Sequence, residues 1–222
     1  MNIGNKASYT TRDWIIPGII LLIALTARLV YAAGIDSMPF SDMADYDKLA
    51  QSLAHGQGFT IDGRVTAYRP PGYPAFMALV YSVAGHSPRL VRIVQALTGT
   101  GCCVLAFFIA RRLLASCSLP PAWLRAAALM TALFAALFDE WIFFTGQLLT
   151  ETLFIFLLGL WLLLALRWQE KTQARPGSLI IPGLLAGALT LVRPVAIFAL
   201  LPAAAWMLFQ KHRSGLSRKR IA

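Results

Sequence analysis

The chain has 222 residues, of which 58% are hydrophobic and only 14% are charged. A soluble domain has about a quarter charged residues, so this composition excludes a disordered chain and argues against a soluble one. The net charge of +10 does not indicate nucleic acid, because the basic residues flank apolar runs as they do beside a membrane. We therefore expect an all-α integral membrane protein that binds membrane lipid and no nucleic acid.

The first apolar run covers residues 14–34 and follows Lys6 and Arg12. The run is too long for the core of a signal peptide, and the YAA sequence near its end is a poor cleavage site. These features predict an uncleaved anchor with a cytoplasmic N-terminus. Arg28 lies near the outer end of this run, where a long side chain is expected to extend to the membrane surface.

Residues 35–92 contain the most polar stretch of the chain, SDMADYDKLAQSL at 41–53. Helical spacing of i, i+3, i+4 and i+7 places four side chains on one face: Asp42, Asp45, Tyr46 and Leu49. Ser41 or Asp42 can cap this helix, and His55-Gly56 ends it. The alternative is an amphipathic surface helix whose acids are only solvated.

Asp47 is expected to lie off the shared face, toward solvent beside Lys48, because five residues separate it from Asp42. Asp45 lies one turn further along the helix than Asp42, where it can pair with Arg69 or orient Asp42. Asp42 sits in the first turn, where the chain leaves most room for a substrate. Among the three aspartates, we therefore expect Asp42 to be the functional carboxylate.

A second motif, YRPPGYPAF at residues 68–76, follows a turn-rich stretch that contains Gly58 and Gly63. Its prolines can end a helix and fix a turn. The apolar run 75–84 comes next. Its ten residues, at a helical rise of about 1.5 Å, cover roughly half of a hydrocarbon core. This run is expected to lie at the interface rather than to span the membrane.

About six transmembrane helices follow from this interpretation. After the first, they are expected at residues 93–110, 122–138, 148–166, 178–192 and 194–210. Thirteen basic residues then lie on the cytoplasmic side: Lys6, Arg12, Arg111, Arg112, Arg125, Arg167, Lys171, Arg175, Lys211, Arg213, Arg218, Lys219 and Arg220. The positive-inside rule therefore predicts cytoplasmic termini, with short interfacial helices in the first outer loop. Residues 139–151 form the second outer loop.

This topology gathers six polar side chains at the outer face: Asp42, Asp45, Tyr46, Arg69, Glu151 and Arg193. Ionisable residues at membrane depth usually face a cavity or a partner. A carboxylate there can take a proton from an acceptor hydroxyl, and arginine can hold a phosphate. The alternative for Glu151 and Arg193 is a mutual salt bridge between helix ends.

The order of motifs carries a resemblance. D-x-x-D-Y-x-x-L-A, G-x-G-F, YRPPGYP, R-x-x-Q, T-E at a span start and L-x-R-P follow one another between residues 14 and 202. This order resembles the GT-C superfamily of membrane glycosyltransferases, in the bacterial branch of protein mannosyltransferases and aminoarabinose transferases. The chain resembles the N-terminal half of such enzymes, with residues 1–210 as the transmembrane module and 211–222 as a basic cytoplasmic tail.

The resemblance implies a transfer of sugar from a polyprenyl-phosphate donor to an extracytoplasmic lipid, glycan or protein, on the periplasmic side of the bacterial inner membrane. It makes Asp42, four residues before Tyr46, the catalytic residue. Asp45, Tyr46 and Glu151 would support it, with Arg69 and Arg193 as contacts of the donor phosphate. A divalent metal ion is a possible cofactor. Some relatives have an acid where Tyr68 precedes Arg69.

Two other functions remain open from the residues alone. One is a non-catalytic membrane scaffold or lipid-binding partner, the remnant of a truncated enzyme. The other is a small transporter, since charges within spans are also a sign of transport. The transporter is the weaker alternative, because the acids cluster at one membrane face and the sequence shows no inverted repeat.

Overall fold

The computed structural model describes residues 14–35, 38–170 and 176–219. The expected cytoplasmic segment with Lys6 and Arg12, and the last three residues of the basic tail, lie outside the described residues. The elements, in chain order, are α1 (Ile15–Ala33), α2 (Asp42–Ala54), β1 (Thr60–Ile61), β2 (Arg64–Val65), α3 (Gly72–Ala84), α4 (Pro88–Leu114), α5 (Pro121–Leu137), α6 (Asp139–Gly146), α7 (Glu151–Glu170), the short 3₁₀ helix η2 (Pro176–Leu179), α8 (Ile180–Val192) and α9 (Ala196–Lys219).

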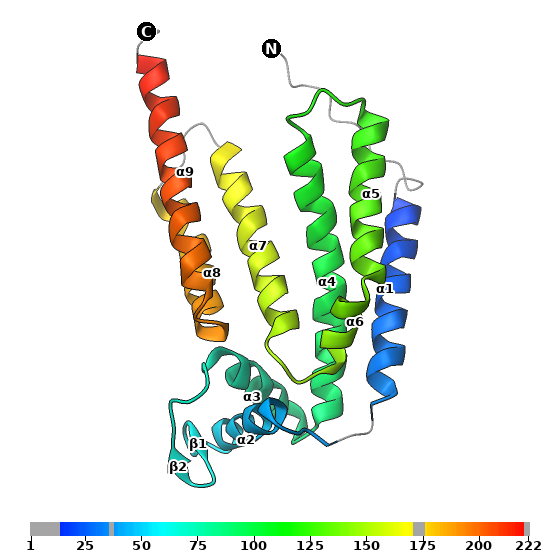
Figure 1. The fold of residues 1–222 in the computed structure, drawn as a ribbon, viewed down its shortest axis with the longest axis vertical. Helices are drawn as coiled ribbons and strands as arrows, with labels where there is room; N and C mark the ends of the chain where they lie inside the picture. Colours follow the sequence, from blue (N-terminus) through cyan, green and yellow to red (C-terminus); the bar gives the residue numbers. More distant parts are fainter. Residues whose placement is uncertain (1–13, 36–37, 171–175, 220–222) are drawn as a thin grey trace.

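Long helices run along the vertical axis of the molecule, and α2, α3 and the two short strands gather at one end of them (Figure 1). We call this group of elements, residues 38–84, the platform. The start of α7, the end of α8 and the start of α9 also lie at the platform end. The protein is an all-α membrane protein with one small hairpin.

In the part of the chain that the structure describes, three helices are long and apolar enough to cross a membrane: α1, α4 and α7. The pair α5 and α6 would add a fourth span, with a bend of 46° between the two helices. The apolar helix α8 and the apolar part of α9 are shorter. The expected number of six spans is therefore not confirmed. Residues 139–151, expected to be a loop, instead form α6 and a short connection.

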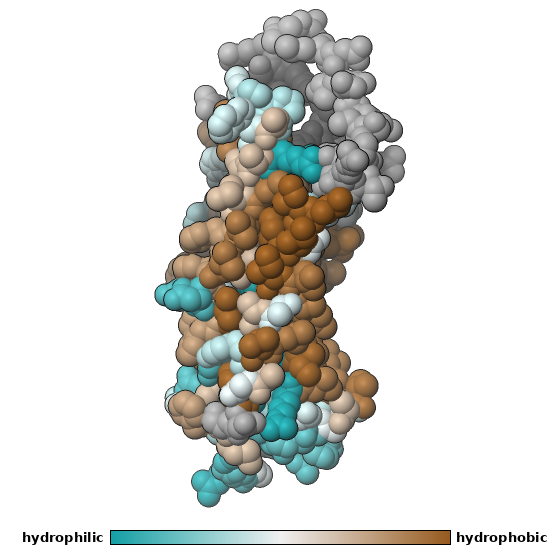
Figure 2. Space-filling model, turned by 90° about the vertical axis from the view of Figure 1, so that its right-hand side faces the viewer, coloured by the Kyte–Doolittle hydropathy of each residue, from teal (hydrophilic) through white to brown (hydrophobic). Residues whose placement is uncertain are grey.

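The core around α4 depends on small residues. This helix packs against α1, α5 and α7. A buried cluster between α1, α4 and α5 is rich in alanine: Ile20, Ala24, Cys103, Ala132, Ala135 and Ala136. Small side chains let helix backbones approach closely, which is the main source of packing energy where lipid removes the hydrophobic drive. The opposite surface of α1 exposes Ile16, Ile19 and Leu22. Figure 2 shows a broad hydrophobic surface over the middle of the molecule, with hydrophilic residues at its lower end.

Arg28 does not extend to the membrane surface as expected, because its side chain is fully buried. Its guanidinium donates to the carbonyl oxygens of Ala135 at 3.0 Å and Ala136 at 3.1 Å, and to Ala24 at 3.0 Å within α1. The last carbonyls of α5 have no partner inside their own helix. Arg28 therefore caps α5, and its positive charge meets the negative end of that helix.

The platform has its own apolar core. Met43 and Tyr46 of α2 pack with Tyr73 and Met77 of α3 in one buried cluster, to which Leu148 contributes from beyond α6. Ser41 has φ of 51° and makes no capping hydrogen bond, so the predicted side-chain cap of α2 is wrong. The predicted end is confirmed, since α2 stops at Ala54 and Gly56 takes a positive φ of 70°.

A β-hairpin forms in the stretch that the sequence marked only as turn-rich. Thr60 pairs with Val65 and Ile61 with Arg64. The two residues between the strands, Asp62 and Gly63, have φ of 50° and 76°. Positive φ at both positions is what a tight turn needs to match the twist of its strands.

The helix that follows, α3, has 13 residues and belongs to the shorter apolar helices. It lies beside α2 beyond the ends of the long helices (Figure 1). At a rise of about 1.5 Å per residue it covers roughly 20 Å, less than a hydrocarbon core. Leu79 and Val83, one turn apart, are exposed. These features agree with the interfacial placement expected for residues 75–84.

Candidate active site

Arg69 joins the two acids of the first turns of α2. Its Nη2 donates to Asp42 and, at 2.9 Å, to Oδ2 of Asp45, which also accepts from Nε at 3.2 Å. Desolvation alone would lower the pKa of Arg69, but the hydrogen bonds to Asp45 and Asp42 outweigh it and raise the pKa above its ordinary value. The guanidinium is therefore a fixed positive charge beside the start of α2.

Two tyrosine rings hold the guanidinium in place. The Cζ atom of Arg69 lies 4.6 Å from the ring centroid of Tyr68 and 5.4 Å from that of Tyr46. Both distances are within the range of cation–π attraction. Tyr68 therefore supplies an aromatic face to the guanidinium. It is exposed to solvent, whereas Tyr46 is buried.

A second ion pair lies where α7 begins and α8 ends. Arg193, the C-cap of α8, donates to Oε1 of Glu151 at 3.0 Å. Its Cζ atom also lies 5.7 Å from the ring of Phe154, one turn along α7. The salt bridge between helix ends, which the sequence left as an alternative, is therefore present. A single bond between part-exposed groups still leaves donors of Arg193 available to a ligand.

Tyr46 links the two ion pairs. Burial raises the pKa of Tyr46, Arg69 and Arg193 act to lower it, and Asp42 and Glu151 act to raise it. Electrostatic influence of this kind requires that both pairs lie near the same phenol. All six side chains that the sequence assigned to the outer face are thus brought together at the platform end, from segments that lie up to 151 residues apart in the sequence.

Gly72 explains how the second motif reaches α8. A Cβ atom at this position would lie 2.7 Å from the carbonyl carbon of Leu191 and 2.8 Å from its oxygen. These are backbone atoms near the end of α8, so they cannot move aside as a flexible side chain would. Glycine at this position lets the start of α3 touch the end of α8, three residues from Arg69 and two from Arg193. The YRPPGYP motif therefore positions the site through its glycine as well as its arginine.

Asp42 and Asp45 differ in how open they are to a substrate. The side chain of Asp42 is 53% exposed and that of Asp45 is 33% exposed, while Arg69 between them is 16% exposed. Asp42 uses only one oxygen for Arg69. The more open carboxylate is the one that the sequence selected.

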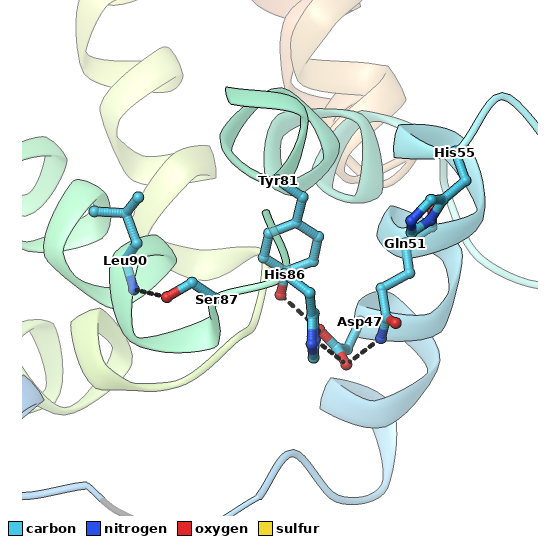
Figure 3. A network of polar contacts seen from close by, with 7 residues as sticks. All are labelled: Asp47, Gln51, His55, Tyr81, His86, Ser87 and Leu90. Atoms are coloured by element: carbon cyan, nitrogen blue, oxygen red, sulfur yellow. Dashed lines mark hydrogen bonds and ion pairs between the residues drawn. The ribbon is translucent and has the colours of Figure 1, made fainter. Parts of the chain in front are cut away.

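The expectation for Asp47 is wrong. Its side chain is only 11% exposed, and it points into a network rather than to solvent (Figure 3). Tyr81 and His86 approach Oδ1, the latter at 3.0 Å, and Nε2 of Gln51 donates to Oδ2 at 2.9 Å. Burial and the bond to Asp47 raise the pKa of Tyr81. Lys48 turns away to Asp62 of the hairpin, at 3.0 Å.

Sequence reasoning missed this network because its partners lie 34 and 39 residues from Asp47. The signal was present in YSVAGHS, where a tyrosine and a histidine flank the glycine that turns α3 into α4. Among the described residues, no group of three His, Cys, Asp or Glu side chains is placed to hold a metal ion. Asp42 and Asp45 bind Arg69 instead.

The fold and the site together define a membrane protein with a charged, partly exposed cluster at one end of a helix bundle. Comparison with protein families matches residues 68–222 to the dolichyl-phosphate-mannose-protein mannosyltransferase family, which is of GT-C type. The match covers more than half of the chain, so the chain belongs to this family of membrane glycosyltransferases. It includes Arg69, Glu151 and Arg193 but begins after Asp42 and Tyr46. No significant match was found among curated proteins or among solved structures.

Proposed function

We propose that the chain is a membrane glycosyltransferase, or the N-terminal module of one, that moves a sugar from a polyprenyl-phosphate donor to an extracytoplasmic acceptor. The donor type is supported by the family, whose name includes a lipid-phosphate-linked mannose. The observation that carries the proposal is the pairing of an open carboxylate, Asp42, with the partly buried guanidinium of Arg69. A general base and an arginine that can bind a phosphate then lie side by side.

In the proposed reaction, Asp42 accepts the proton of an acceptor hydroxyl as its oxygen forms a bond to the anomeric carbon of the sugar. The bond from that carbon to the phosphate oxygen breaks, and the polyprenyl phosphate leaves with the electron pair. Arg69 and Arg193 stabilise the negative charge that grows on the leaving phosphate. Asp45 and Glu151 hold these arginines in place.

Transfer can be measured with the membrane-embedded protein and a panel of radiolabelled polyprenyl-phosphate sugars. We expect one donor to be consumed and Asp42→Asn to lower the rate by about 10²–10⁴-fold, as the loss of a general base does. Asp62→Asn is the matched control, because that acid is exposed in the hairpin and pairs with Lys48. Normal transfer by Asp42→Asn would overturn the role of Asp42. If no donor of the panel is consumed but one of them binds, the non-catalytic lipid-binding scaffold is supported instead.

We also propose that the protein lies in the bacterial inner membrane, with both termini in the cytoplasm and the platform in the periplasm. Support comes from the segregation of basic residues and from the gathering of the platform at one end of the long helices. Cys117, between α4 and α5, is exposed, whereas Cys102 and Cys103 are buried. An impermeant thiol reagent should therefore leave Cys117 unmodified in intact cells. It should modify a cysteine placed at the exposed Gln57 in a Cys117→Ser background. The reverse pattern would refute this orientation.

A further inference from the structure

Two polar residues at the start of α4, Arg92 and Gln95, are buried although neither belongs to the charged cluster. They form the R-x-x-Q motif, whose role the sequence left open. Their spacing of three residues places both side chains on one face of α4. Buried polar groups are costly unless their hydrogen bonds are satisfied, so the partners of these two side chains show what they hold together.

The first set of partners is three consecutive carbonyl groups. The amide nitrogen of Gln95 donates to the carbonyl oxygens of Thr145 at 2.8 Å and Gln147 at 2.7 Å, and Nε of Arg92 donates to that of Gly146 at 3.0 Å. These carbonyls lie at the end of α6, where a helix has no internal donors for them. The motif thus fixes the chain that leads, four residues later, to Glu151.

The second set of partners belongs to the platform and to the segment just before it. The hydroxyl of Tyr73, a fully buried residue of α3, donates to the amide oxygen of Gln95 at 2.6 Å. The ring of Tyr73 meets that of Tyr46 edge-on, with 5.2 Å between centroids. Nη1 of Arg92 donates to the carbonyl of Ile35 at 3.3 Å, in the segment that leads from α1 to α2.

We propose that Arg92 and Gln95 are positioning residues that set the spacing between the ion pair of Asp42 and the ion pair of Glu151. Gln95 is the central member, because a single amide binds the platform through its oxygen and the α6–α7 connection through its nitrogen. As a role in catalysis, this inference rests on the proposed function. As a statement about geometry, it does not.

The geometry can be tested by pulsed electron resonance between spin labels in the bilayer-embedded protein. Labels are placed at Gln57→Cys, just after α2, and Val195→Cys, between α8 and α9; both positions are exposed. Cys117→Ser removes the exposed native thiol. We expect Gln95→Glu to broaden or shift the distance distribution between the labels. A carboxylate can still accept the hydrogen bond from Tyr73, but it has no N–H to donate to the carbonyl oxygens of Thr145 and Gln147. Tyr73→Phe, which cuts only the platform side, should have the smaller effect.

Thr98→Val is the matched control. It lies one turn further along α4, and its hydroxyl bonds only to Val94 of the same helix. We expect the control to keep the parent distance distribution. If Gln95→Glu is folded and also keeps that distribution, the inference is overturned, whether or not the protein is active. Gln95→Met, which is close in length and lacks all three polar bonds, provides a second variant if the glutamate does not fold.

Measurements of kcat and KM distinguish a residue that positions the site from one that only stabilises the fold. We expect the folded Gln95 variant to lose kcat by about 10²-fold, as small misplacements of reacting groups do, while the KM for the donor changes little. Equal loss of kcat and of folded protein, with an unchanged distance distribution, would show a purely structural role and refute the inference. A changed distribution in a protein that transfers no sugar would refute the proposed function and leave the geometric inference standing.

Discussion

The two faces of α2 carry aspartates in opposite situations. Asp42 and Asp45 face Arg69, and Asp42 is more than half exposed with one oxygen engaged by that arginine. Asp47 faces the turn between α3 and α4, where Tyr81, His86 and Gln51 surround it. Both faces are ionic or strongly hydrogen-bonded, so the presence of partners does not distinguish them. The distinction is whether a carboxylate still has room and a lone pair for another molecule.

This difference separates a carboxylate that can act on a substrate from one that holds the fold. A buried, fully bonded carboxylate has little free energy to gain from a ligand, because a ligand would have to replace existing bonds. An open carboxylate with one oxygen on a guanidinium can still accept a proton on its other oxygen. The same helix therefore supplies a candidate catalytic face and an anchoring face.

The largest expected effect tests this division directly. Asp42→Asn should remove transfer by about 10²–10⁴-fold and leave the free energy of unfolding nearly unchanged, since an exposed ion pair contributes little. Asp47→Asn should do the reverse. Asp47→Asn should lower the free energy of unfolding by about 1–3 kcal/mol, because the new amide N–H group would face a hydrogen-bond donor that now binds the carboxylate. It should leave the activity per folded molecule intact. Both variants need parallel transfer and denaturation measurements. Loss of activity in folded Asp47→Asn would break the comparison.

Gly72→Ala should have the next largest effect, on both stability and activity. Its methyl group would meet the backbone of Leu191, so α3 must move away from α8. Overpacking of this kind costs about 1–3 kcal/mol. Thermal unfolding in lipid nanodiscs would measure the loss. Gly183→Ala, whose methyl group meets no atom within 4 Å, is the control and should be neutral or slightly stabilising, because alanine favours a helix interior over glycine. Equal stability of the two variants would mean that the contact between α3 and α8 is not tight.

The smallest effects are expected from the ion pairs themselves. A double-mutant cycle on Glu151 and Arg193 should give a coupling of at most about 1 kcal/mol, and a cycle on the more exposed Lys48 and Asp62 should give less. Couplings of this size would leave Arg193 free to exchange its acid for a phosphate. A coupling several times larger in the first cycle would assign that pair to the fold, together with Asp47.

Much of the fold followed from local patterns. Apolar length predicted the helices of the bundle, and the i, i+3, i+4 pattern of Asp42, Asp45 and Tyr46 predicted α2. The limits of α6 and of the hairpin were missed, because eight residues and two-residue strands carry too little periodicity. Local pattern also cannot tell whether α8 and α9, whose apolar parts are short, cross a membrane alone or by packing together.

The site was predicted correctly where its residues form local motifs. It was missed where a partner far away in the sequence determines the position of a side chain. The gathering of Arg69 with Asp42, and of Glu151 with Arg193, agrees with the sequence. Asp47 was wrongly predicted to face solvent, because helical spacing alone cannot predict a contact with His86, 39 residues away. The roles assigned to these residues remain predictions, and they depend on the experiments above.

The buried guanidinium of Arg28 has a consequence for biosynthesis. Its acceptors on α5 lie 107 and 108 residues later in the chain. At a synthesis rate of about 5–20 residues per second, α1 must wait roughly 5–20 s before they are made. During that time Arg28 opposes insertion, by less than the about 2.5–3.5 kcal/mol of an arginine at the centre of a span, because it lies toward one end of α1. We expect nascent chains halted before Ala135 to insert α1 less efficiently than the same chains with Arg28→Leu. Completion of α5 should remove the difference, so the first helix of this protein is secured only when the fifth arrives.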